Sequence, residues 1–444
     1  MPDDGFVQFN KHIIEYMRGV YVLLLISLFG YAGRVGGQES VTITQCYEWA
    51  RANYPQIHQM GLIDQTERYS LSNVGKAWLP QLSVSGKASY QSDVTKLPFD
   101  GDKISSLLPG FEIPSLSKDQ YQVVAQVDQT IWDGGSARSA RALTRAEATA
   151  NREQLESELY ALNDRVNQLY FGCLLQDELI RQNALLQKEL QVNIERIEAM
   201  MENGVANQSD LESMEVELLN ACQNEIELRA SRTAYRQMLA TFINKPLTDQ
   251  VVLKTPESPE RSLSTQINRP ELRALDAKSE WIETQNKQVT AGLMPRIGAF
   301  VQGGYGRPGL NMLEDSFEPY YVAGVRLSWN LGKLYTLKND RRKIEVSRRQ
   351  IDVQRETFLF NTRLQLLRQN TEIKKMTDLM RADDDIIRLR TSIKQAAEVK
   401  LENGVISVTD LIREINAEDM ARQTAAAHRV QRLMTIYNYM YTTN

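Results

Sequence analysis

The sequence predicts a mainly helical protein with a small β portion, in which one order of elements occurs twice. Three observations predict this fold class. Short motifs recur in the same order about 200 residues apart. Two very long segments contain no proline, and four short segments alternate between apolar and polar residues. The chain has 444 residues, which is enough for a large core or for several domains.

The N-terminal segment has the features of an export signal. Met17-Arg18 precedes an apolar run from Val20 to Phe29, and small residues follow through Gly37. This order is typical of a secretory signal peptide, and the run is shorter than the roughly 20 residues of a spanning helix. We predict a signal peptide with an upstream extension over residues 1–37. An N-terminal anchor or a buried helix is the alternative.

Paired motifs indicate an internal duplication. The letters MENGV at 201–205 recur as LENGV at 401–405. One such match could arise by chance, but further pairs follow in the same order, which favours duplication. They are Asp210-Leu211 with Asp410-Leu411, AWLPQL at 77–82 with GLMPRI at 292–297, and VDQTIWDG at 127–134 with VRLSWNLG at 325–332.

The duplication divides the chain into two structural repeats. We expect the first repeat over 38–243 and the second over 270–444, each in the order helix, strand, strand, long helix, shorter helix. The segment 244–269 contains three prolines and several serines and is the expected linker.

Four strands are expected at about 82–91, 121–132, 296–305 and 320–330, because apolar and polar residues alternate there. Each segment is close to the length of about 9 to 11 residues with which a tilted strand crosses a bilayer. Tryptophans 78, 132 and 329 lie near strand ends, where interfacial aromatic residues are found in membrane strands. The alternative is a half-buried sheet of a soluble protein.

The number of strands predicts an oligomer. A bacterial barrel needs at least about 8 strands, so four cannot close one alone. Three copies would give 12 strands, and two copies would give 8. The sequence alone leaves both solutions open.

The two long segments are expected to be helices that end in tight turns. Residues 136–201 and 334–401 contain no proline, and leucines such as Leu155, Leu159 and Leu162 recur at steps of 4 and 3. A helix of about 65 residues would be roughly 100 Å long, which is too long for a compact globule. Glycine suits the left-handed end of such a helix, and Gly204 and Gly404 follow directly.

Composition excludes several classes of function. The net charge of -4 is no sign of a nucleic-acid binder. Three scattered cysteines and three histidines show no disulfide framework, metal-ligand spacing or triad pattern. We therefore expect no catalytic residue, no metal and no cofactor, and the chain is predicted not to be an enzyme.

At this point the chain resembles the TolC-like outer-membrane efflux protein family. The resemblance covers nearly all of residues 41–440. It depends on LPQL at 79–82, TIWDGG at 130–135, the Gly-Val and Asp-Leu turns near 204–211 and 404–411, and the twofold repeat. Each motif is weak alone, and their common order makes the match specific.

This resemblance implies a homotrimer in outer-membrane lipid, with a 12-stranded transmembrane β-barrel that continues into a long periplasmic α-helical barrel. It implies a passive exit duct of a tripartite, for example multidrug, efflux pump or of a type I secretion system. The implied partners are a periplasmic adaptor (membrane fusion) protein and an inner-membrane transporter of RND or ABC type. Transport energy comes from that transporter.

The resemblance also implies functional residues at the helical turns. Gly204, Val205, Gly404 and Val405 match the periplasmic tip against which adaptor hairpins dock. Asp210 and Asp410 match acidic positions near the pore constriction. The alternative is helix capping, since Ser209 to Glu212 spells a capping box and Ser407 to Asp410 is similar to one.

The chain departs from the family pattern at the expected constriction. Leu401 and Ile406 stand where some members have a tyrosine and an arginine that hold the tip closed. Arg413 stands where a second acidic ring would fall, so it could pair with Asp410 or Asp210. Competing predictions are a periplasmic adaptor, which should show one hairpin between β-rich halves, and a coiled-coil scaffold, which needs no export signal.

Overall fold

The computed structural model describes residues 40–95, 117–258, 265–312 and 314–444. The expected signal peptide at 1–37 lies outside the described residues. The chain divides into two compact units. The hairpin unit comprises residues up to 54, 162–264 and 367–441, and the sheet unit comprises 55–161, 265–366 and 442–444.

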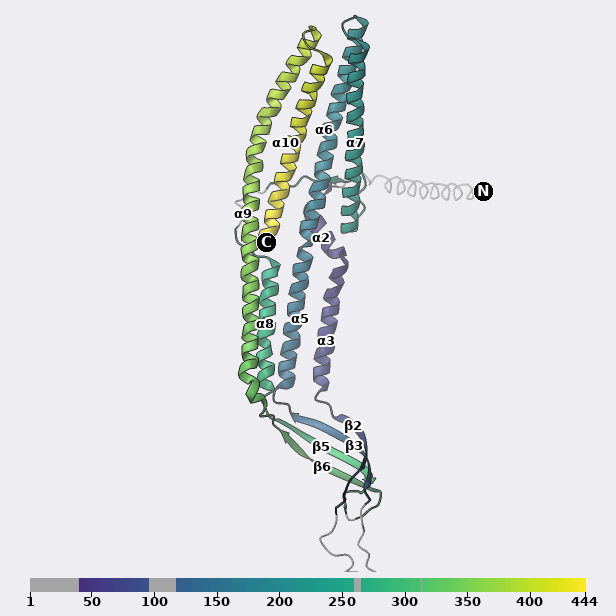
Figure 1. Ribbon diagram of the computed structural model, residues 1–444, viewed down its shortest axis with the longest axis vertical. Coiled ribbons are helices and arrows are strands. Elements are labelled where there is room, and N and C mark those ends of the chain that lie inside the picture. Colours follow the sequence, from purple (N-terminus) through teal and green to yellow (C-terminus); the bar gives the residue numbers. More distant parts are fainter. Residues whose placement is uncertain (1–39, 96–116, 259–264, 313) are drawn as a thin grey trace, which may run out of the picture. The chain divides into compact units, whose positions relative to one another are not determined.

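The hairpin unit contains two long helical hairpins. Helices α6 (Leu162–Glu202) and α7 (Gln208–Ile243) lie side by side and form one of them. The C-terminal part of α9 (Lys333–Glu402) and α10 (Val408–Thr443) form the other (Figure 1). All four helices share one apolar core near their turns. It consists of Leu190, Ile194, Ile197, Met214, Ala221, Ala397, Leu401, Val408, Leu411, Ile412 and Ile415.

A second apolar core of the hairpin unit holds the linker between the repeats. Helix α2 (Ile43–Asn53) packs on α6 and α7, and the two-residue strand β1 (Ser40–Val41) pairs in parallel with β4 (Val252–Leu253). The hydroxyl of the fully buried Tyr170 lies 2.8 Å from the carbonyl of Val41 and 2.7 Å from that of Lys254. Strand β4 was not expected, because two residues show no period.

Four helical segments build the helical part of the sheet unit. They are α3 (Gln59–Lys76), α5 (Ser136–Tyr160), α8 (Pro270–Ala291) and the N-terminal part of α9. Helix α5 packs on both α3 and α8. Ile282 of α8 packs against Ile344 and Ile351 of α9. Ion pairs support these contacts, including Arg152 with Asp64 at 2.8 Å and Arg348 with Glu283 at 2.7 Å.

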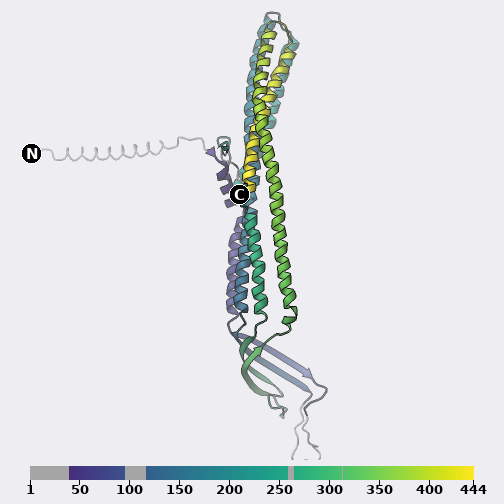
Figure 2. The ribbon, with the colours of Figure 1, turned by 90° about the vertical axis from the view of Figure 1, so that its left-hand side faces the viewer.

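The sheet unit also contains one antiparallel four-stranded sheet, which twists as seen in Figures 1 and 2. The strand order is β2 (Gln81–Tyr90), β3 (Asp119–Trp132), β5 (Arg296–Arg307) and β6 (Glu318–Ser328). These strands lie within two residues of the four alternating segments. The register between β3 and β5 shifts after Thr130. Strands β2 and β6 are the two open edges within the part of the chain described.

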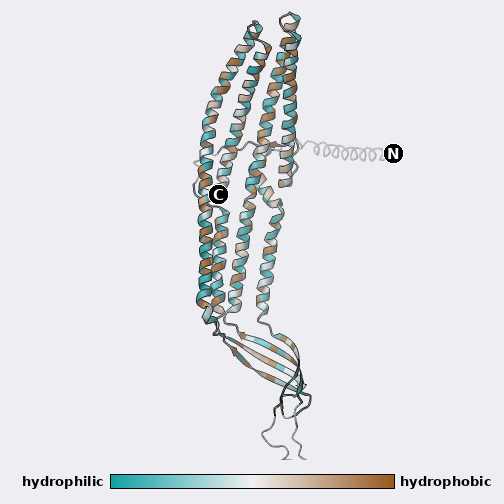
Figure 3. Cartoon of the chain, viewed as in Figure 1, coloured by the Kyte–Doolittle hydropathy of each residue, from teal (hydrophilic) through white to brown (hydrophobic). Residues whose placement is uncertain are grey.

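One face of the sheet is apolar and largely exposed, although Phe317 stacks on Tyr121 and Tyr305 at one end of it. Bands of high and low hydropathy alternate along the strands (Figure 3). Relative exposure reaches 72% for Leu82, 70% for Val84, 79% for Tyr321 and 70% for Val325. The opposite face carries polar side chains such as Gln122, Gln126 and Asp128.

Two of the expected helices are interrupted. One helix was expected at the start of the first repeat, but α2 ends before Pro55 and a 3₁₀ turn (Pro55–His58) separates it from α3. Proline lacks the backbone N–H that a continuous helix requires. The long helix expected over 136–201 consists of α5 and α6, with Ala161 between them in helical backbone geometry. No helix within the described ranges is long and apolar enough to cross a membrane.

Candidate functional site

The two hairpin turns have nearly the same backbone geometry. Gly204 and Gly404 adopt φ angles of 70° and 68°, in the left-handed region that favours glycine. The N–H of Gly204 donates to the carbonyl of Met201 at 2.9 Å, and that of Gly404 donates to Leu401 at 2.9 Å. The next N–H groups reach one residue further back, as in a Schellman motif. The repeated sequence therefore folds into a repeated turn.

Each turn presents one valine to solvent. Val205 is 59% exposed and Val405 is 69% exposed. The residues that follow them, Ala206 and Ile406, pack instead against the apolar core of the hairpins. Each turn therefore combines a buried attachment with one exposed apolar side chain.

Asp210 and Asp410 cap the helices that return from the turns. Asn207 and Asp210 form a capping box at the start of α7, in which each side chain accepts from the other's backbone N–H. Ser407 and Asp410 do the same at the start of α10. The predicted box from Ser209 to Glu212 is wrong, because the helix begins two residues earlier than that pattern required. The box at Ser407 and Asp410 is confirmed.

Arg413 lies beside Asp410 on the first turns of α10. Its Nη2 atom is 3.5 Å from Asp410 Oδ1, and its Nε atom is 3.4 Å from Glu414. The hydroxyl of Ser407 donates to the Asp410 carboxylate at 2.7 Å, and this hydrogen bond lowers the pKa of Asp410 below its usual value. Asp410 is therefore ionised at neutral pH beside a cation of its own helix.

Leu401 does not lie at a surface. It is 3% exposed and belongs to the apolar core that joins α9 to the other three helices of the hairpins. The side chain expected at a constriction therefore acts by packing. The sequence could have predicted the burial of Leu401, because Ala397 and Leu401 continue the apolar coiled-coil repeat of the helix.

A charged cluster, here defined as Glu189, Thr391, Lys394, Glu418 and Arg422, joins the two hairpins. Lys394 of α9 is 13% exposed and contacts Glu189 of α6 and Glu418 of α10, the latter at 2.7 Å. Glu418 is 3% exposed and also accepts from Thr391 at 2.6 Å and from Arg422. A buried carboxylate needs such partners to remain charged. No local sequence pattern marks this cluster, because its residues come from three helices.

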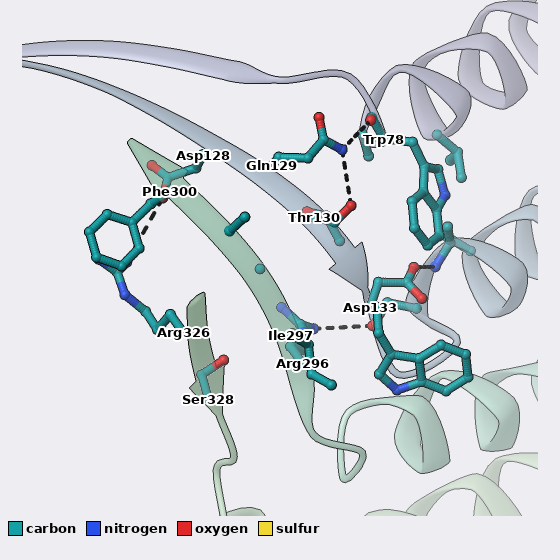
Figure 4. A pocket seen from close by; sticks show the side chains of 18 residues that line it. Trp78, Asp128, Gln129, Thr130, Asp133, Arg296, Ile297, Phe300, Arg326 and Ser328 are labelled. Atoms are coloured by element: carbon teal, nitrogen blue, oxygen red, sulfur yellow. Dashed lines mark hydrogen bonds and ion pairs between the residues drawn. The ribbon is translucent and has the colours of Figure 1, made fainter. Parts of the chain in front are cut away.

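The polar face of the sheet borders a pocket of about 450 Å³ (Figure 4). Arg326 lies over the ring of Phe300, 4.7 Å from its centroid, and 3.9 Å from Asp128 of strand β3. Trp78 and Trp132 also line this pocket, which places these two tryptophans beside the polar face. Arg326 and Asp128 give this face one cation and one anion side by side.

Two of the three cysteines, Cys46 and Cys173, are buried and unreactive. Burial raises the pKa of Cys46 and of Cys173 to about 12, so neither thiol ionises near neutral pH. No group of His, Cys, Asp and Glu suited to a metal ion occurs among the described residues.

Comparison with protein families gives one match. Residues 46–245 match the family described as outer membrane efflux protein. This range runs from α2 through α7 and so spans one repeat, and the second repeat has the corresponding elements from α8 to α10. A comparison with curated protein sequences gave no match.

Solved outer-membrane proteins have the same fold. The chain is similar to CusC, described for its transmembrane channel formation, with a TM-score of 0.64 and 14% identity over 90% of this chain and 92% of that one. The chain is also similar to the outer-membrane channel OprN, with a TM-score of 0.65 and 14% identity over 90% of this chain and 89% of that one. For the outer membrane protein VceC of Vibrio cholerae the TM-score is 0.61, with 12% identity over 90% of this chain and 95% of that one.

The family match and the shared fold indicate a transport protein of the kind that forms outer-membrane channels. Over residues 46–245 the chain is similar to the outer membrane efflux protein family. It is an efflux protein of the outer membrane, with the fold of the TolC-like channels and a helical part on the periplasmic side.

Asp419, next to the charged cluster, gives a prediction for stability. Burial raises the pKa of Asp419 to about 6, so its charged form is unfavourable in the folded state. The contribution of Asp419 to the free energy of unfolding is therefore fully present below about pH 4, and it is lost as the pH rises through about 6. Asp419→Asn should therefore stabilise the protein by about 1 kcal/mol at pH 7.5, after allowance for partial exposure, and by nothing at pH 4. Thermal unfolding at both pH values measures this, and a pH-independent difference would contradict it.

Proposed function

We propose that three copies of this chain form a passive exit duct across the outer membrane, as part of a tripartite efflux pump or a type I secretion system. A periplasmic adaptor protein docks on the hairpin turns. An inner-membrane transporter of RND or ABC type supplies the energy and selects small molecules or proteins as cargo.

The exposed apolar face of the sheet carries this proposal. Soluble monomers rarely expose a large contiguous apolar patch. Membrane strands, by contrast, alternate between apolar residues that face outward and polar residues that face inward. The open edges of β2 and β6 present unpaired backbone groups, which are costly in lipid. Pairing β2 of one copy with β6 of the next satisfies both edges and remains antiparallel, because the four strands alternate in direction.

The size of the barrel interior favours three copies of the chain over two. Eight strands enclose a space that side chains fill, so two copies would leave no passage. Twelve strands leave room for a water-filled duct lined by the polar face. The helices offer a matching contact surface, since Val346, Val353 and Phe360 repeat every seven residues along α9 and are each more than half exposed.

The hairpin turns are the proposed docking site for the adaptor. Gly204 and Gly404 allow two identical sharp turns, and Val205 and Val405 provide the exposed apolar contacts. Two equivalent turns per chain give six per trimer, which suits a partner that is itself built of helical hairpins. The core beneath the turns, including Leu401, holds them in place.

Asp210, Asp410 and Arg413 are the proposed charged groups of the constriction. Two carboxylates per chain would attract cations to a narrow mouth, and Arg413 would partly offset the charge of Asp410. Their capping role is compatible with this, because a capping carboxylate keeps its charge.

Export and assembly together test the proposed function. Replacing Val205 and Val405 by aspartate puts a charge on both exposed turns and should abolish export, because an apolar partner surface loses its contact. Export is scored as resistance of a strain that lacks the native gene. The purified variant should still have the mass of three chains in detergent, and Val205→Ile with Val405→Ile should export normally. Full export by the aspartate variant would exclude docking at the turns. A wild-type protein that stays monomeric in water without detergent would exclude the duct.

A second pair of substitutions separates capping from pore electrostatics. Asp210→Asn with Asp410→Asn keeps an oxygen acceptor for the caps but removes the charge, so the cation preference should fall while stability changes little. Asp210→Ala with Asp410→Ala should also cost about 1 kcal/mol per cap. Reversal potentials across planar bilayers in a salt gradient measure the preference. An unchanged reversal potential in the asparagine pair would leave capping as the only role.

A further inference from the structure

A groove in the helical part of the sheet unit is lined by cations that have no acidic partner. The groove has a volume of about 540 Å³ and lies between α5 and α8. Arg138 of α5 and Lys287 of α8 line it, and both are exposed. Neither forms an ion pair with any described residue. By contrast, Arg348 nearby is paired with Glu283 at 2.7 Å.

The remaining lining of the groove is amphiphilic. The hydroxyls of Ser139 and Thr290 donate to carbonyls of their own helices, so the two cations are its free donors. Ala142, Ala291 and Met294 provide an apolar wall. A neighbouring groove that shares Asn286 and Thr290 adds Arg341 of α9, which has no acidic partner among the described residues. The two carboxylates of that groove, Glu283 and Glu345, are paired with Arg348 and Arg349.

The groove lies within a turn or two of the strand ends. Strand β3 ends at Trp132 and α5 begins at Ser136, while α8 ends at Ala291 and β5 begins at Arg296. Each helical turn spans about 5.4 Å. The headgroup layer on each side of a bilayer is about 5 to 7 Å thick. If the strands cross the hydrocarbon core, the groove falls in this layer.

The groove is on the opposite side of α5 from the polar sheet face. The pocket on that face is lined by Asp128 and Arg326 of the sheet and by Ala137 and Ala140 of α5. At about 100° per residue, Arg138 lies 100° to 160° around the helix axis from those alanines. The cations are therefore on the side of the apolar, lipid-directed face.

We propose that this groove binds the phosphate of an anionic phospholipid headgroup in the inner leaflet of the outer membrane. Arg138 and Lys287 contact the phosphate from two helices, and Met294 contacts the start of an acyl chain. The proposal rests on the proposed function, in which the apolar sheet face meets lipid. Bound lipid would fix the depth of the sheet in the membrane, since the cations hold the protein at the headgroup layer.

The test compares lipids and variants in the purified full-length protein. Binding of short-chain phosphatidylglycerol, phosphatidylcholine and inorganic phosphate is measured by native mass spectrometry and by titration in detergent. Phosphatidylglycerol should bind at least tenfold more tightly than either of the others. Arg138→Gln with Lys287→Gln should weaken phosphatidylglycerol binding by tenfold or more, at about 1 kcal/mol per cation. Arg138→Lys should retain most of it.

A matched control removes the same charge elsewhere. Lys188→Gln with Lys374→Gln lies in the hairpin unit and should leave lipid binding unchanged. Equal binding of the two lipids, phosphate binding as tight as lipid, or an unaffected Arg138 and Lys287 double variant would each overturn the proposal. The mass and the channel conductance of the same samples distinguish failure of the groove proposal from failure of the proposed function. A conducting trimer without lipid preference refutes only the groove, and a water-soluble monomer refutes the duct.

Discussion

The apolar face of the four-stranded sheet constrains everything else in this protein. Leu82, Val84 and Val325 are 70% exposed or more, and burying apolar surface is worth about 25 cal/mol per Å². A chain in water would cover such a face with helices, but the helices of the sheet unit pack on each other instead. In the proposed trimer, lipid against the apolar face and strands of the neighbouring copies at both edges would together remove this cost. The strands, their number and the oligomer are thus parts of one physical solution.

The packing of the hairpin unit holds the two turns at Gly204 and Gly404 in a fixed position. Its apolar core joins four helices directly behind the turns, and the charged cluster around Lys394 adds specific contacts among α6, α9 and α10. Buried ion pairs add little net stability, but a misaligned partner would leave a buried charge unpaired. The cluster therefore favours one alignment of the two hairpins. That alignment presents Val205 and Val405 as exposed apolar contacts on a firm base.

Sequence periodicity predicted the elements better than it predicted the site. Strand positions follow from alternation, because one face of a membrane strand is apolar throughout. Pro55 could have predicted the break between α2 and α3, whereas nothing around Ala161 marks the end of α5. The turns at Gly204 and Gly404 were predictable from local sequence, since a left-handed residue depends on its neighbours only. Lys394, Glu189 and Glu418 were not, because tertiary packing alone brings them together.

The orientation of the sheet faces is the central claim, and two adjacent residues test it most directly. Val325 and Arg326 lie on opposite faces of β6. In a variant without native cysteines, a fluorophore is attached to Val325→Cys or to Arg326→Cys and the protein is placed in bilayers. The account predicts that brominated lipid quenches the label at 325 while aqueous iodide quenches the label at 326. Quenching of both labels by iodide, with none by brominated lipid, would contradict it.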